Sequence, residues 1–154
     1  MKDSVVQVTF AGIIGALVMD LIMYLVILMG LKTTAPWVIA AYVFLTPDYV
    51  YSVSGTIIGL IGTVALNVTA AAMTLLLCKL TGFDYAVLKG IITVNAFSFI
   101  TMGLFMPLLN IAPQIRQQPV TNYLALLVLS IIGGIEAYIL KKLNPNGLSH
   151  KQKS

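Results

Sequence analysis

The stretch VVQVTFAGIIGALVMDLIMYLVILMG, residues 5–30, contains a single charged residue, Asp20. An α-helix rises 1.5 Å per residue, so about 20 apolar residues cross the roughly 30 Å hydrocarbon core of a bilayer. A carboxylate inside that core costs about 2.5 kcal/mol or more, and such residues are usually protonated, paired or turned toward a wet cavity. We therefore interpret residues 5–29 as a transmembrane helix and Asp20 as a candidate functional residue.

The whole composition points to an integral membrane protein. Of the 154 residues, 59% are hydrophobic and 9% are charged, and the mean hydropathy is +0.98. A soluble domain has about 25% charged residues and has no core large enough for this much apolar surface. The net charge of +4 comes from residues beside the apolar segments. We interpret these residues as topology signals that contact lipid, and we expect no nucleic-acid partner.

Three further segments have the length and composition of transmembrane helices, at residues 54–78, 85–109 and 122–140, and a basic tail follows at 141–154. The predicted fold is an all-α integral membrane protein with four transmembrane helices in a single domain, residues 1–154. The basic residues are split unevenly between the two predicted sides, and lysine and arginine favour the cytoplasmic side. We expect both termini in the cytoplasm of a multi-pass plasma-membrane protein. On that side lie Lys2, Lys79, Lys89, Lys141, Lys142, Lys151 and Lys153, against Lys32 and Arg116 on the other.

Residues 35–45 form an apolar segment that is too short to cross the bilayer. Thr34 precedes it as a candidate helix cap, and Pro36 is tolerated in a first helical turn. We expect a short interfacial helix on the outer surface between the first two spans. A re-entrant segment and a fifth span through Pro47 and Asp48 are the alternatives.

Small residues recur four apart on the first two spans. The second span has Gly55, Gly59, Thr63 and Asn67 in register, and the first has Gly12, Ala16 and Asp20. Such stripes let helix backbones approach closely in lipid, so we expect the two faces to pack together. Packing in this register predicts Asn67 as the partner of the Asp20 carboxyl, with Thr63 as a neighbour.

The last two spans carry a second polar set. Gly133 and Ala137 form a small face on the fourth span, and Glu136 lies beside them. Glu136 is a candidate proton- or ion-binding residue, with Asn95 of the third span as its partner. Alternatively, its side chain extends toward Lys141 and Lys142 at the interface. For both acids, a structural hydrogen bond is the competing interpretation.

The motif Gly-Ile-Ile occurs twice, at residues 12–14 and 90–92, and Ala-Pro follows each copy at 35–36 and 112–113. An internal duplication would make the chain two parallel hairpins, with any site at the interface between them. Chance similarity between apolar segments is the alternative hypothesis.

The residues that bind metals or perform catalysis are scarce. Cys78 is the only cysteine and His150 the only histidine, which excludes an intramolecular disulfide and the usual zinc ligand sets. No nucleophile and base occur at a recognisable spacing. We expect no catalytic residue, no metal and no cofactor.

Several segments in order, SGTIIG at 54–59, VLKGI at 87–91, FMP at 105–107 and Pro113, resemble the YqhR-like membrane proteins of Gram-positive spore-forming bacteria. The resemblance covers most of the chain. It implies a four-span fold in a bacterial plasma membrane and assigns no active residues. The chain is also similar in architecture to the small multidrug transporters, which have four short spans and one acid in the first.

Two functions follow as hypotheses. The first is a non-enzymatic structural, accessory or partner-binding bundle in the lipid bilayer, where Asp20→Asn is tolerated. The second is a small transporter or channel, a homo-oligomer that uses Asp20 as its proton- or cation-binding group. The two differ in whether the carboxyl of Asp20 titrates during function.

Overall fold

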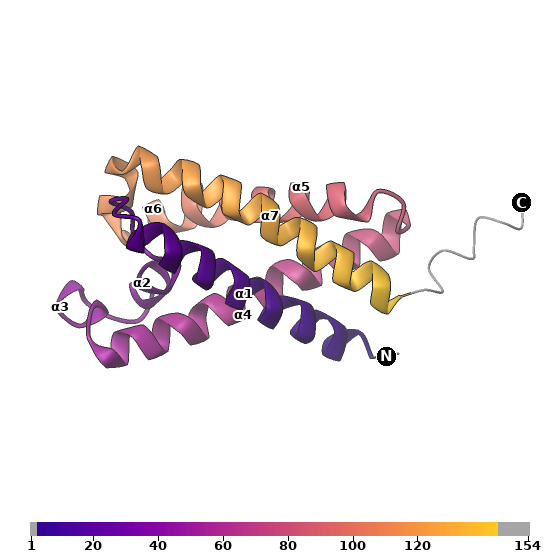
Figure 1. Ribbon diagram of the computed structural model, residues 1–154, viewed down its shortest axis with the longest axis horizontal. Coiled ribbons are helices and arrows are strands. Elements are labelled where there is room, and N and C mark those ends of the chain that lie inside the picture. Colours follow the sequence, from indigo (N-terminus) through magenta and orange to yellow (C-terminus); the bar gives the residue numbers. More distant parts are fainter. Residues whose placement is uncertain (1–2, 145–154) are drawn as a thin grey trace, which may run out of the picture.

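The computed structural model describes residues 3–144, which form an up-and-down bundle of four long helices without strands in that range (Figure 1). All four are long and apolar enough to cross a membrane, as the sequence predicted. The third is continuous but changes its hydrogen-bonding pattern partway. The four are α1 (Ser4–Leu28), α4 (Val53–Thr81), α5 (Ala86–Ile100) with its continuations η1 (Thr101–Phe105) and α6 (Met106–Leu108), and α7 (Pro119–Leu143).

Local sequence signals set the ends of these helices. Asp3 caps α1 by accepting a 2.8 Å hydrogen bond from the Val5 amide, and Ser52 caps α4 through the Gly55 amide at 3.0 Å. Side-chain oxygens satisfy amides that the first turn of a helix leaves free. At the other end of α4, the chain turns at Gly82 with φ +87°. The Lys89 ammonium there donates to the Gly82 carbonyl at 2.7 Å.

Four of the five lysines within the described range lie at one end of the bundle. Lys79 and Lys89 flank the α4–α5 turn and Lys141 and Lys142 end α7, whereas Lys32 follows α1 at the opposite end. Figure 1 shows the start of α1, the α4–α5 turn and the end of α7 together. The expectations for Lys2, Lys151, Lys153 and most of the basic tail lie outside the described residues.

The first two spans pack closely at Gly12. A Cβ added there would lie 2.4 Å from the Val68 Cα, so the backbones of α1 and α4 touch where the stripe on α1 predicted. Ala16, one turn further, is fully buried. For the two glycines at the start of the second stripe, Gly55 and Gly59, the expected partner was wrong. Gly55 lies against the carbonyls of Tyr49 and Val50 rather than against α1.

The segment between the first two spans packs against the face of α4 that contains Gly55 and Gly59. It folds as α2 (Pro36–Ala41) and α3 (Pro47–Val50) instead of one helix over 35–45. α2 packs on α4, because a Cβ at Gly59 would lie 1.9 Å from the Trp37 carbonyl oxygen and one at Gly62 would lie 2.9 Å from the Ala40 Cβ. Six residues extend only about 9 Å, which excludes a fifth span. The short helix thus packs on α4 at the end of the bundle opposite the α4–α5 turn.

The last two spans meet at a pair of glycines. A Cβ on Gly90 would lie 2.2 Å from the Gly133 carbonyl oxygen and 2.5 Å from the Ala137 Cβ. Gly133 and Ala137 therefore form the predicted packing face. The glycines of the two Gly-Ile-Ile motifs, Gly12 and Gly90, have equivalent roles, because each contacts the span that follows it, which is what an internal duplication predicts.

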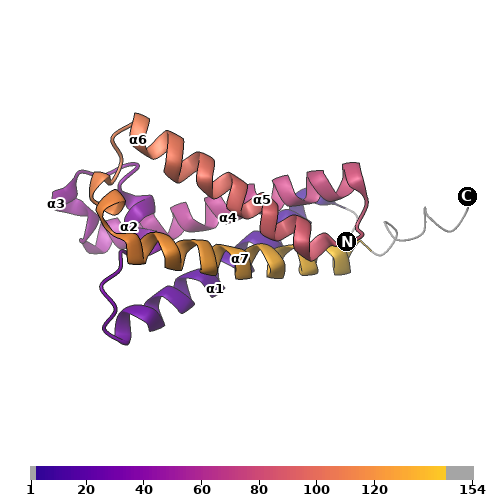
Figure 2. The ribbon, with the colours of Figure 1, turned by 90° about the horizontal axis from the view of Figure 1, so that it is seen from above.

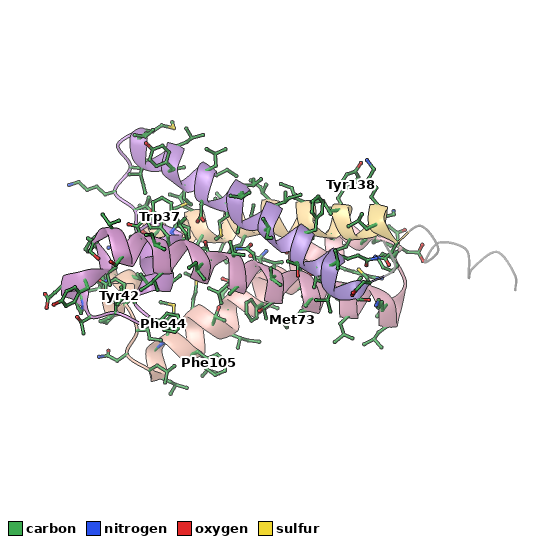
Figure 3. All side chains as sticks on the ribbon, turned by 90° about the horizontal axis from the view of Figure 1, so that it is seen from below. Trp37, Tyr42, Phe44, Met73, Phe105 and Tyr138 are labelled. Carbon is green, nitrogen blue, oxygen red and sulfur yellow. The ribbon has the colours of Figure 1, made fainter. Side chains whose placement is uncertain are left out.

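The four helices are close at the lysine end and diverge toward the other. In Figure 2 the α6 end of the third span stands apart from the start of α7, while α5 and α7 are close near the lysines. Figure 3 shows Trp37 and Tyr42 at the divergent end, and Tyr138 pointing away from the bundle. The divergence leaves room between the spans, and the candidate site lies there.

Candidate functional site

Asp20 accepts a hydrogen bond from Thr63, and not from Asn67 as the sequence predicted. The Thr63 hydroxyl lies 2.9 Å from Asp20 Oδ2, and Oδ1 is buried without a hydrogen-bond partner. The Asn67 amide donates instead to the Thr63 carbonyl at 2.8 Å and contacts the Met19 sulfur at 3.9 Å. The small residues did bring the first two spans into contact, but the polar partner lies one turn earlier on α4.

The position of the Thr63 hydroxyl suits either charge state of Asp20. Its oxygen lies 2.9 Å from Asp20 Oδ2 and 2.9 Å from the Leu60 carbonyl, and a hydroxyl has only one proton to donate. An ionised Asp20 accepts that proton. A protonated Asp20 donates to Thr63, which then donates to Leu60. The pair can therefore hold a proton or release it without loss of the contact.

Glu136 has surroundings different from those predicted. It is fully buried, and neither carboxyl oxygen has a hydrogen-bond partner. A Cβ at Gly15 would lie 2.3 Å from its Oε1, so the side chain is directed into the α1–α7 interface. It does not extend toward Lys141 and Lys142, and it does not reach Asn95. A buried charge without a partner costs several kcal/mol, so this position is unfavourable for an ionised carboxyl.

Asn95 belongs to a separate contact between the last two spans. Its amide donates to the Ser130 hydroxyl at 2.9 Å and to the Ile91 carbonyl at 2.8 Å. The expected Glu136–Asn95 pair is therefore absent, and Asn95 joins α5 to α7 two turns from Glu136. Ser130 was missed because a serine inside an apolar span gives no signal of its partner.

A partly open cavity of about 280 Å³ lies among all four spans and α2. Its wall is almost entirely carbon and sulfur, and four of the seven methionines of the chain line it, namely Met19, Met23, Met102 and Met106. Thr63 and Asn67 also line the cavity, whereas neither Asp20 nor Glu136 does. The cavity is therefore hydrophobic and contains neither acid.

The polar side chains on the cavity wall all have partners elsewhere in the protein. Ser98 contacts the Met102 sulfur at 3.4 Å, and Thr101 donates to the Phe97 carbonyl at 2.9 Å. Thr34 and Thr121 each donate to Gln118 Oε1 at 2.8 Å. Thr63 and the amide nitrogen of Asn67 are also bonded, so the hydrogen-bond donors on the wall are all engaged with protein groups.

A second hollow of about 220 Å³ lies along the other side of η1. It shares Ser98, Met102, Met106, Ile111 and Ala125 with the main cavity. Gly103, in the middle of η1, has no atom within 4 Å of an added Cβ. The η1 part of the third span is therefore poorly packed on two sides. Single π-helical turns are frequent at functional sites, and the sequence offered no sign of this one.

Among residues 3–144, no three His, Cys, Asp or Glu side chains lie together as a metal site. No family model, curated protein or solved structure matches the chain. The geometry of the two acids and the cavity thus supplies the argument for function.

Proposed function

We propose that this chain is a non-enzymatic membrane bundle of structural or accessory type, which binds a larger membrane partner or a second copy of itself. The observation that supports it is the placement of the acids. Both carboxyls are directed into helix interfaces, and neither lines the cavity through which a solute would pass. Polar groups inside a membrane bundle hydrogen-bond across helices, and Asp20 with Thr63 is such a contact.

Native electrophoresis of mildly solubilised membranes tests this proposal. We expect the wild type in an assembly larger than the monomer, and the same assembly for Asp20→Asn, because an asparagine also accepts a hydrogen bond from Thr63. A monomer at native expression levels would contradict the partner. Loss of a cellular phenotype in a folded, inserted Asp20→Asn variant would contradict the structural role of the acid.

A proton- or cation-coupled transporter is the second candidate function. The observation in its favour is that Thr63 lines the cavity and bonds Asp20, so one hydrogen bond separates the acid from the solute space. Liposomes loaded with a pH-sensitive dye provide the test. Proton flux above that of protein-free vesicles, abolished by Asp20→Asn, would favour the transporter, and equal flux would reject it.

The proposed location is a bacterial plasma membrane with both termini in the cytoplasm. The grouping of lysines at one end of the bundle and the resemblance to the YqhR-like proteins support it. Single cysteines in a Cys78→Ser background test the orientation. Asp3→Cys should resist a membrane-impermeant maleimide on intact cells, and Tyr123→Cys should react; the reverse pattern would invert the topology.

A further inference from the structure

We propose that the main cavity holds one acyl chain of a membrane phospholipid. This inference goes beyond the proposed function, because a bound chain requires no particular role for Asp20 or Glu136. It rests on the chemistry of the wall, on the size of the cavity and on what lies outside the third span.

The wall offers few groups that would hold water, and its hydrogen-bond donors are engaged with the protein. An engineered apolar cavity of about 150 Å³ stays dry and binds small hydrocarbons, and this cavity has a volume of about 280 Å³. Water needs two to four polar partners in such a site. The hydroxyls of Thr63, Ser98 and Thr101 are already engaged with protein groups. A hydrocarbon occupant fits this surface and a polar solute does not.

The methionines suit a flexible chain. Met19 and Met23 come from α1, and Met102 and Met106 come from the third span on another side of the cavity. Thioether side chains are unbranched and adapt their shape to what they contact. They can therefore adapt to an acyl chain whose conformation varies, beside the stiffer β-branched residues that also line the cavity.

The third span provides the route from the bilayer. Of the 18 residues that form the most apolar stretch of this span, only 11% are buried, against 33% in each of the other spans. Leu104 of η1 is half exposed and lines neither hollow. Phe105 is also half exposed and lines the main cavity, so it lies at the edge of the cavity (Figure 3). In a membrane, phospholipid chains surround such residues. The two hollows on either side of η1 bring the same chains to the cavity.

Three alanine-to-phenylalanine substitutions test the site. Ala70 is 4% exposed and lines the cavity, so Ala70→Phe fills it from α4. Ala125→Phe fills it from α7, in case the first variant does not fold. Ala65→Phe adds the same ring on the exposed face of α4 and is the matched control. Each protein is purified, delipidated in detergent and offered either dioleoyl phosphatidylglycerol or oleic acid.

Native mass spectrometry then counts retained lipid, and thermal unfolding confirms the fold. We expect one phosphatidylglycerol on the wild type and on Ala65→Phe, and retention about tenfold weaker or less for a folded cavity-filling variant. Added phospholipid should raise the Tm of the first two proteins only. Equal retention by all variants, no retention by the wild type, or retention of oleic acid alone would overturn the proposal.

Discussion

The carboxyl of Glu136 lies against Gly15, so close that a Cβ at position 15 would be 2.3 Å from Oε1. This contact joins the first and last helices of the described chain. It places an ionisable group where neither oxygen has a hydrogen-bond partner, although Glu136 is fully buried. Buried polar groups without partners cost about 1–3 kcal/mol, so the protein retains this residue against its own stability.

Replacing Glu136 with an apolar residue of similar length should stabilise the protein. Glu136→Met removes the unpartnered carboxyl and keeps the volume, and we expect a gain of about 1 kcal/mol in the free energy of unfolding. Thermal unfolding in detergent measures it. Glu136→Gln is the control, because it keeps a polar group there and should give no gain. A lower Tm for Glu136→Met would mean that Glu136 has a stabilising partner.

The glycine contact between α5 and α7 should distinguish two adjacent residues. Gly133→Ala places a methyl group 2.6 Å from the Gly90 carbonyl oxygen, whereas Gly134→Ala meets nothing closer than 3.5 Å. We expect a loss of about 1–3 kcal/mol for Gly133→Ala, since helices must separate. Gly134→Ala should unfold at the wild-type temperature or slightly above it, because alanine favours helix over glycine. Similar losses for both variants would contradict the α5–α7 register.

The hydrogen bond between Thr63 and Asp20 should contribute measurably to stability. Thr63→Val keeps the shape of the side chain and removes the hydroxyl, which leaves both Asp20 oxygens without a partner. We expect a loss of about 1–2 kcal/mol by thermal unfolding. Thr63→Ser retains the hydroxyl and should lose less than half as much. If Asn67 were the partner of Asp20, Asn67→Leu would have the larger effect of the two substitutions at these positions.

The docking of α2 on α4 should depend on Gly59. A methyl group at this position would lie 1.9 Å from the Trp37 carbonyl oxygen, so Gly59→Ala must displace α2. Trp37 is the only tryptophan, and its fluorescence should change wavelength when α2 moves. Gly103→Ala is the matched control, because no atom lies within 4 Å of the added methyl. An unchanged spectrum for Gly59→Ala would place α2 elsewhere.

The predictions from sequence succeeded where they depended on one segment at a time. Hydropathy and length located all four long helices, and the lysines marked one end of the bundle. The small faces of Gly12 and of Gly133 with Ala137 were correct as well. The errors concerned partners. Gly59 packs on Trp37 instead of α1, Asp20 bonds Thr63 instead of Asn67, and Glu136 contacts Gly15 instead of Asn95.

The sequence by itself determined that this chain forms four apolar helices. An α-helix makes its backbone hydrogen bonds within its own segment, so no peptide group has to be exposed to hydrocarbon without a partner. Only the tertiary structure decided which faces meet. In lipid, no hydrophobic force favours one apolar face over another, so the choice depends on the fit of small residues to particular neighbours. That fit placed α2 against Gly59, kept the α6 end of the third span apart from α7 and left the cavity among the four spans and α2.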